Sequence, residues 1–556
     1  MLNNKKFVIV LFIFLLSGCN SSVSSSANLN SQTLKDLSAN FTSSQRLYTD
    51  ILEAKYDDLF CANRSGNDCN INISGIKHEA GSGEFDLISK PIINNKSNVE
   101  YVDIQSVNYD TTAKFLVGNS GQSKVKTYHT SGAIMFPGGS KFNSSNIKGV
   151  VVYFHPTAFD KRNVPSMSYI DKNSFQDYVY AGLYAAQGYV VVLPDYIGQG
   201  VDYNNIHPYV LYPQQNVDSA IQLLNSVMQD IVDKYQLNLY ATQLKTFSVG
   251  YSEGGAYSLW FSKCVQKKQC NLVTSTLNGD FTSGYLKFYD YTASVGMDGA
   301  YDLENVVKPF LFDRVHRGIT ENKYKIYSQP ITNTVKPGLS SLALMSYLTY
   351  SRDNPYSMSA AFNNGFYSMN CDNVSQKDKC YVNGKHLNLS QAMQEPHVLD
   401  VDFVKSILNS AYGQSTNDID NYYMNSSGLV TSAYNSILAL TFKDVYSTDY
   451  DFDQSIKDAS IVDFGATTNK PLYLFSLSHD SIVSVLNTDN FVEKAKNNSL
   501  VQSKIMNNSV VHTDIKNIPD ELLFMQDIDH IRGENYANIF ALNFLNQCVK
   551  NPSTCK

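Results

Sequence analysis

Several patterns that would point to particular classes of protein are missing from this sequence. Charged residues make up only 17% of the 556 residues, and the formal net charge is −7. A negative chain without a cluster of basic residues is a poor electrostatic partner for nucleic acid or for an anionic membrane surface. The sequence also lacks metal-ligand spacings, a phosphate-binding glycine loop and a dinucleotide fingerprint, so we expect no metal and no cofactor. No apolar run is long enough to span a bilayer.

The first residues have the pattern of a targeting segment. Two lysines precede the short apolar run Phe7–Leu16, and Ser, Gly and Cys19 follow it. The sequence around Cys19 resembles a bacterial lipobox, which implies that residues 1–18 are a signal peptide and that Cys19 receives a lipid. The alternative is an ordinary signal peptide with a chance cysteine. Residues 19–42 are rich in Ser and Asn and are expected to form a flexible tether.

This N-terminus predicts an exported protein that is held on a bacterial membrane by the lipid on Cys19. Asn20, which would be the second residue of the mature chain, is not the aspartate that resembles an inner-membrane retention signal. The outer membrane is therefore the favoured location.

The cysteines agree with export. Apart from Cys19 there are eight, and they fall into four close pairs. An even number of cysteines in an exported chain indicates disulfides, whereas a zinc site would need C-x-x-C spacings or nearby histidines. We expect four local bridges: Cys61–Cys69, Cys264–Cys270, Cys371–Cys380 and Cys548–Cys555. Peptide mapping without reduction tests this pairing, and a free thiol at any of these positions would contradict it.

One stretch organises the rest of the chain, the G-x-S-x-G pattern of Gly250 to Gly254 with Ser252 at its centre. The residues Leu244–Val249 before it are typical of a strand, and Gly255–Lys263 after it are typical of a helix. A serine on so tight a strand-to-helix turn is held in a strained backbone conformation with its hydroxyl exposed. A Cβ at either glycine would collide with neighbouring backbone. The alternative is a glycine-rich turn that carries a surface serine.

Strands and helices alternate around this turn. Continuous apolar runs predict strands that are covered on both faces, and helical spacing separates them. The expected strands are 99–107, 111–117, 123–133, 149–154, 188–195, 244–249, 291–297, 471–477 and 509–513. The expected helices of the core are 175–187, 216–235 and 535–548, with an earlier helix at 45–60. This alternation predicts an α/β fold with a mostly parallel central sheet and helices on both faces.

Together with Ser252, these elements resemble an α/β-hydrolase, and within that superfamily the secreted lipases and esterases. The loop Leu193–Gly200, followed by His207–Tyr209, is similar to a loop of bacterial relatives of fungal secretory lipases. The resemblance implies a hydrolase domain formed by residues 43–303 and 470–556. Residues 304–469 are too long for a crossover and are mostly helical in pattern, so we expect an inserted helical cap; the alternative is a separate domain with no catalytic role. Asp195 is expected to fix its loop by hydrogen bonds.

The resemblance also implies the order nucleophile, acid, base along the chain. Asp480 follows the strand at 471–477 and is the expected acid. His530 precedes the last helix and is the expected base. Rival acids are Asp489, which lies further from the strand end, and Asp463, which precedes the strand. The rival histidines are His512, which falls in the expected last strand, and His479, which neighbours the acid.

Two backbone N–H groups are expected to form the oxyanion hole. One comes from Glu253, the residue after the nucleophile. The other comes from the loop after the strand at 149–154, where Pro156 replaces the usual glycine of lipases. Because proline has no N–H, the second donor is Thr157 or Ala158.

The sequence therefore predicts a lipid-anchored serine hydrolase that cleaves ester or lipid substrates through Ser252, His530 and Asp480. Two alternatives stay open. One is a serine peptidase of the prolyl-oligopeptidase type, although residues 43–145 show no propeller repeat. The other is a surface binding lipoprotein that keeps the fold without activity.

Overall fold

The computed structural model describes the core of the chain in several ranges. These ranges are 98–117, 122–158, 164–166, 176–202, 205–238, 243–268, 270, 288–312, 450–480, 482–507 and 530–555, with short pieces within 339–350 and 380–387. The expected signal peptide, the tether, Cys19 and the helix at 45–60 lie outside the described residues.

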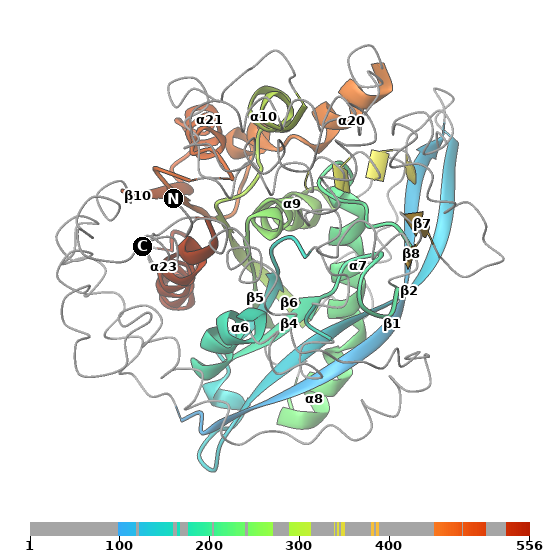
Figure 1. The fold of residues 1–556 in the computed structure, drawn as a ribbon. Coiled ribbons are helices and arrows are strands. Elements are labelled where there is room, and N and C mark those ends of the chain that lie inside the picture. The colour runs from blue at the N-terminus through green and yellow to red at the C-terminus, as the bar shows by residue number, and fades with distance from the viewer. Residues whose placement is uncertain are drawn as a thin grey trace, which may run out of the picture.

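A mixed eight-stranded sheet forms the centre of the described protein (Figure 1). The strands lie in the order β1-β2-β4-β3-β5-β6-β9-β10. The pairs β1–β2 and β2–β4 are antiparallel, and the other neighbours run parallel. This mixed sheet with helices on both faces is an α/β-hydrolase fold, as the sequence predicts. The strands are β1 (Tyr101–Val117), β2 (Gln122–Gly138), β3 (Gly149–Phe154), β4 (Tyr189–Pro194), β5 (Leu244–Tyr251), β6 (Tyr289–Met297), β9 (Leu472–Leu477) and β10 (Val501–Met506).

Helices cover both faces of the sheet, and an apolar core lies between the sheet and the helices on each face. On one face lie α6 (Gln176–Ala186) and α23 (His530–Lys550), which pack on residues such as Val151 and Phe475. On the other lie α7 (Pro213–Ser226), α8 (Met228–Tyr235) and α9 (Glu253–Lys267), as Figure 1 shows. The strands β3 and β4 are buried along their whole length, which explains their unbroken runs of apolar residues.

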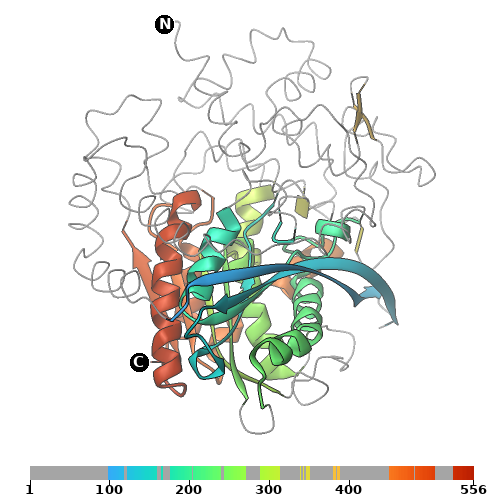
Figure 2. The same ribbon diagram turned by 90° about the horizontal axis from the view of Figure 1, so that it is seen from below.

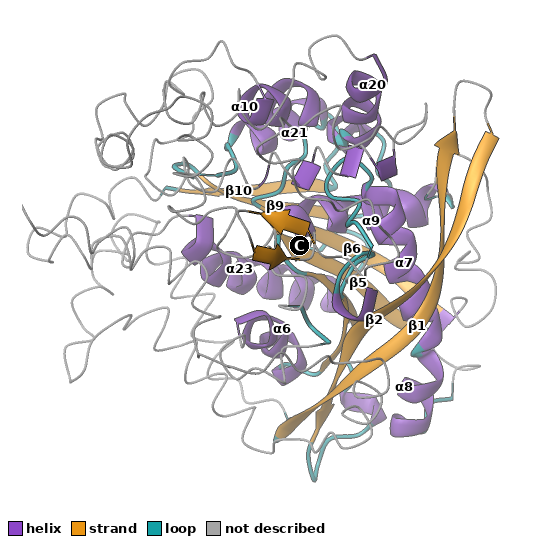
Figure 3. Ribbon diagram, turned by 45° about the vertical axis from the view of Figure 1, so that its right-hand side comes forward, coloured by secondary structure: helices purple, strands orange, loops and turns teal. Residues whose placement is uncertain are grey.

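The antiparallel part of the sheet is longer than the sequence indicates. We expected strands at 99–107 and 111–117, but β1 is one strand of 17 residues paired with β2 along its length. Tyr109, at the expected interruption, is held by a hydrogen bond to Ser219 of α7. Figure 2 shows β1 and β2 as a long curved ribbon, and in Figure 3 they reach well past the other strands.

Two further elements differ from the expectation. The expected helix 216–235 is two helices, because Val227 ends α7 and begins α8. The break follows Ser226, whose hydroxyl donates to the carbonyl of Leu223 and competes with the helical hydrogen bonds. Pro213 at the first helical position starts α7 before the predicted residue. The sequence did not reveal β10, and the strand expected at 509–513 lies outside the described residues.

The inserted segment is described only in part. It contains a π-helical turn at Leu303–Val307, α10 (Lys308–Phe312), the two-stranded hairpin β7 (Cys380–Val382) and β8 (Lys385–Leu387), and α20 (Tyr450–Ala459). After α20, Ile461 and Phe464 join the apolar core that contains α9. The hairpin lies within the segment that we expected to be a mostly helical cap, and that expectation stays a prediction.

Within the described residues the structure forms two of the expected disulfides, Cys264–Cys270 and Cys548–Cys555. Cys61, Cys69 and Cys371 lie outside those residues, so the pairs Cys61–Cys69 and Cys371–Cys380 stay predictions. Among the helices that the structure describes, none combines the length and the apolar character needed to cross a bilayer.

Candidate active site

The carboxyl ends of the parallel strands bring polar residues to one edge of the sheet. His155 follows β3, Asp195 follows β4, Ser252 follows β5, Asp298 follows β6, and Asp480 comes three residues after β9. Because parallel strands end at the same edge, residues that are far apart in the sequence meet here.

Ser252 stands on the turn between β5 and α9 in an unusual conformation. Its φ is +55° and its ψ is −118°, which is rare for a residue with a side chain. The Ser252 N–H donates to the carbonyl of Met297, the last residue of β6, over 2.8 Å. This contact fixes the turn against the neighbouring strand, and the serine keeps 8% of its surface exposed.

The glycines of the turn are required for the reason that the sequence indicates. A Cβ on Gly250 would lie 2.1 Å from the carbonyl oxygen of Gly254, and a Cβ on Gly254 would lie 2.0 Å from that of Phe154. Both contacts are with backbone atoms, so no side chain can rotate to relieve them. The expectation of a glycine turn around Ser252 is therefore confirmed.

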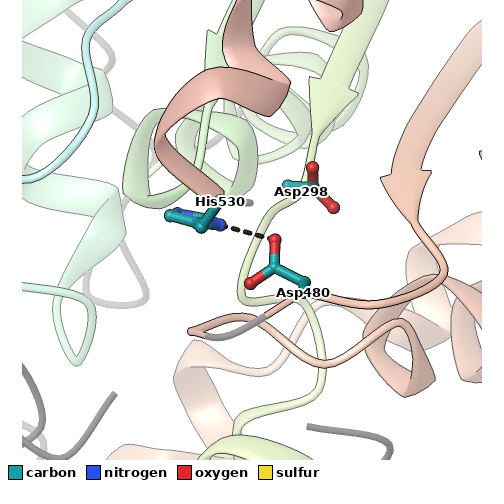
Figure 4. A group of neighbouring side chains, drawn as sticks. All are labelled: Asp298, Asp480 and His530. Atoms are coloured by element: carbon teal, nitrogen blue, oxygen red, sulfur yellow. Dashed lines mark hydrogen bonds and ion pairs between the residues drawn. The ribbon is translucent and has the colours of Figure 1, made fainter. Parts of the chain in front are cut away.

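The structure brings the three expected catalytic residues into one chain of hydrogen bonds. His530 Nε2 lies 2.8 Å from Ser252 Oγ, and His530 Nδ1 lies 2.7 Å from Asp480 Oδ2. Figure 4 shows the pair of His530 and Asp480, which come from the start of α23 and from the turn after β9. Both side chains are buried, at 8% and 0% exposed. A serine, an imidazole and a carboxylate in this order can transfer a proton away from the hydroxyl.

Asp480 is held by its own turn. Its Oδ1 accepts hydrogen bonds from the backbone N–H groups of Ile482 and Val483, each over 2.7 Å. Because these donors fix one oxygen, the other oxygen faces His530. The residue thus serves both as the anchor of a turn and as the partner of the imidazole.

The rival residues lie elsewhere. Asp489 is in the first turn of α21 (Leu486–Lys494), and Asp463 forms an exposed ion pair with Lys494 over 3.0 Å. His479 contacts the neighbouring Ser478 through Nδ1 at 2.7 Å. His512 lies outside the described residues.

One expected oxyanion donor directly follows the serine, and the other two lie in the loop after β3. Glu253 is the first residue of α9, where backbone N–H groups have no partner within the helix. Thr157 and Ala158 follow β3, and the Thr157 hydroxyl lies 3.1 Å from the hydroxyl of Tyr209. Pro156, which stands between His155 and these two residues, has no N–H to donate.

Asp195 fixes its loop, as expected. Its carboxylate accepts hydrogen bonds from the hydroxyl of Ser131 over 2.5 Å and from the N–H of Ser166 over 2.8 Å. Burial raises the pKa of Asp195 to about 6.

A buried pair of His207 and Glu253 supports the turn, and its role was not visible in the sequence. His207 Nε2 lies 2.6 Å from Glu253 Oε1, and its Nδ1 lies 3.0 Å from the carbonyl oxygen of Ile197. A carbonyl only accepts, so Nδ1 carries a hydrogen. An Nε2 without a hydrogen would turn its lone pair toward the Glu253 carboxylate and repel it. A proton is therefore shared between His207 Nε2 and Glu253 Oε1. His207 also stacks on Tyr196, with ring centroids 5.6 Å apart.

The replacement Glu253→Ala is expected to destabilise the protein by about 3–5 kcal/mol, because it leaves His207 buried with no partner for Nε2. The control is Glu304→Ala, which removes an exposed ion pair with Lys457 at 3.6 Å and is expected to cost less than about 1 kcal/mol. Urea unfolding of both variants measures the difference. Equal losses in the two variants would show that the buried pair does not support the turn.

Asp298 is a second acidic residue that the sequence analysis did not select. It directly follows β6, and it is 1% exposed. Its sequence signal was its position after an expected strand at the same edge of the sheet. Asp298, Asp480 and His530 each place one oxygen or nitrogen atom within 4.8 Å of the others (Figure 4).

Comparisons with known proteins gave matches only among solved structures. No protein-family model and no curated protein matches the chain. A putative hydrolase from Legionella pneumophila is similar with a TM-score of 0.47 and 16% identity, over 84% of this chain and 95% of that one. The rice cell wall degrading esterase LipA from Xanthomonas oryzae has a TM-score of 0.47 and 16% identity, over 83% and 94%. Candida antarctica lipase A in its closed state has a TM-score of 0.40 and 11% identity, over 74% of this chain and 76% of that one.

Proposed function

We propose that the protein is a serine hydrolase of carboxylic esters, with lipids or small esters as substrates. The observation that carries this proposal is the continuous hydrogen-bonded chain from Ser252 through His530 to Asp480 on a strained turn. A surface serine on a glycine-rich turn has no need of a buried imidazole at hydrogen-bond distance, nor of a carboxylate behind it.

In the proposed reaction, His530 Nε2 takes the proton of Ser252 while Ser252 Oγ bonds to the ester carbonyl carbon. Asp480 holds the imidazole in orientation and stabilises its positive charge. The oxyanion is bound by the N–H of Glu253 and by that of Thr157 or Ala158. The proton then passes from His530 to the leaving alcohol as the C–O bond breaks. Water repeats these steps on the acyl-enzyme and releases the acid.

Labelling with a fluorophosphonate followed by peptide mapping tests this proposal. We expect the phosphonyl group on Ser252 in the unchanged protein and no label after His530→Ala, because the serine needs its base. A folded protein that takes no label would favour the binding lipoprotein. A labelled protein that cleaves prolyl peptides but no esters would favour the peptidase.

We also propose that the mature chain is exported and begins at a lipid-modified Cys19. This rests on the N-terminal sequence pattern alone. The mass of the N-terminal peptide, taken from protein expressed in a Gram-negative bacterium, tests it. A peptide that retains residues 1–18, or an unmodified Cys19, would contradict the anchor.

A further inference from the structure

Asp298 places a second buried carboxyl beside the proposed triad. It comes from the end of β6, the strand that lies between β5 with Ser252 and β9 with Asp480. Figure 4 shows its carboxyl beside Asp480 and His530, and one oxygen or nitrogen atom of each residue lies within 4.8 Å of those of the other two. Nothing in the chain of hydrogen bonds from Ser252 to Asp480 requires this residue.

The carboxyl of Asp298 is held in place through one oxygen. Oδ1 accepts from the hydroxyl of Ser476 and from the N–H of Leu477, each over 2.9 Å. The backbone N–H of Asp298 donates to the carbonyl of Phe475 over 2.8 Å. All three partners belong to β9, the strand that leads to Asp480, so the two carboxyls are fixed relative to each other.

The other oxygen has a contact that indicates a bound proton. Oδ2 of Asp298 lies 3.1 Å from the hydroxyl of Tyr251, and that hydroxyl also contacts the carbonyl oxygen of His530 more closely. Tyr251 has a single hydroxyl hydrogen, and the carbonyl can only accept it. Both contacts are complete hydrogen bonds only when Asp298 carries a proton and donates it to the tyrosine oxygen.

The electrostatics agree with this hydrogen count. Burial and, after it, the charge of Asp480 raise the pKa of Asp298 above the usual range of a carboxyl. Asp480 accepts from two N–H groups and His530, so the negative charge is best placed there. The titratable groups that face this site are Asp480 after β9, His530 and Glu534 of α23, Tyr251 of β5 and Tyr301 after β6.

We propose that Asp298 is a second acid of this site, a positioning residue that stays neutral beside Asp480 and becomes the carboxylate partner of the imidazole when Asp480 is absent. This rests on the proposed serine hydrolase function. Without Asp480 its repulsion disappears, while the charge of His530 still favours the carboxylate, so Asp298 ionises beside the imidazole.

The test measures ester hydrolysis by Asp480→Ala, by Asp298→Asn and by the double variant. Where a triad has a single acid, its removal costs about 10⁴-fold in kcat. We expect Asp480→Ala to lose only about 10²-fold, and the double variant to fall to the full loss of about 10⁴-fold. Alanine is used at position 480 because its small side chain leaves room for Asp298 to approach His530. Asparagine is avoided there because its amide could stabilise the wrong tautomer of the His530 imidazole.

The replacement Asp298→Asn, made both in the unchanged protein and in Asp480→Ala, gives an independent readout, the pH profile of kcat/KM. Asn is chosen because Asp298 has a φ of +42°, which Asn tolerates, and because its oxygen can still accept from Ser476 and Leu477. With Asp480 present, Asp298→Asn replaces one neutral group by another, so the acid limb is expected to stay in place. In the Asp480→Ala background the ionised Asp298 stabilises the inactive imidazolium, so its removal is expected to move the acid limb to lower pH, by roughly half a unit.

Asp218→Asn in α7 is the matched control. Burial raises the pKa of Asp218 as well, but its side chain is bonded to Gln222 within α7. The acid limb of the kcat/KM profile is therefore expected to stay in place in this variant. Circular dichroism and melting curves establish that each variant is folded. If Asp480→Ala does not fold, Asp298→Asn alone decides the proposal: an unmoved acid limb supports a neutral Asp298 beside Asp480, and a shifted limb contradicts it.

The proposal is overturned if Asp298→Asn leaves the residual activity and the acid limb of Asp480→Ala unchanged, or if it shifts the acid limb while Asp480 is present. Failure of the proposed function would appear differently, as an unchanged protein that takes no fluorophosphonate label at Ser252.

Discussion

Alanine in place of Ser252 is expected to lower kcat on a short-chain p-nitrophenyl ester by about 10⁴–10⁶-fold. The hydroxyl is the group that His530 Nε2 contacts at 2.8 Å, so its removal leaves the base without a nucleophile to activate. The fold is expected to survive, because the Ser252 N–H that bonds to Met297 belongs to the backbone. Steady-state hydrolysis together with a melting curve measures both effects.

The control for this variant is Ser258→Ala in α9. The Ser258 hydroxyl is buried and donates to that of Ser248 over 3.1 Å, away from His530. Its loss is expected to cost about 1 kcal/mol of stability and to leave kcat unchanged within about twofold. Persistent ester turnover in Ser252→Ala would end the assignment of the nucleophile, whichever way the control behaves.

The site could be predicted where local sequence specifies its geometry. The strand, the glycine turn and the helix around Ser252 are neighbours in the chain, so the spacing of Gly250 and Gly254 is enough to indicate the turn. Asp480 and His530 follow from the ends of elements, because an α/β sheet gathers its strand ends at one edge.

The remainder of the site depends on contacts that no short pattern specifies. Glu253 and His207 are separated by 46 positions, yet they share a proton in the interior. Asp298 was missed although it follows an expected strand, because its significance comes from Asp480, after β9, and Tyr251, on β5. The fold also depends on a contact that no short pattern specifies. Tyr109, in the middle of β1, forms a hydrogen bond to α7 that exists only in the packed structure.

The replacement Gly254→Ala is expected to reverse the usual ranking of glycine and alanine in a helix. Gly254 lies in the first turn of α9 without a positive φ, so helix propensity alone would favour alanine by about 1 kcal/mol. Its Cβ, however, would lie 2.0 Å from the Phe154 oxygen and 2.6 Å from the His155 oxygen. Backbone must move to admit it, and we expect a loss of about 3 kcal/mol.

The displaced backbone is the one that carries Ser252 and the loop before Thr157, so ester turnover is expected to fall together with stability. The matched variant is Ala256→Gly, two residues further along α9, which is expected to cost about 1 kcal/mol through helix propensity. Urea unfolding ranks the two. If Gly254→Ala were the more stable variant, β3 and α9 would not approach as closely as the turn around Ser252 requires, and the strained geometry of the nucleophile would lose its physical basis.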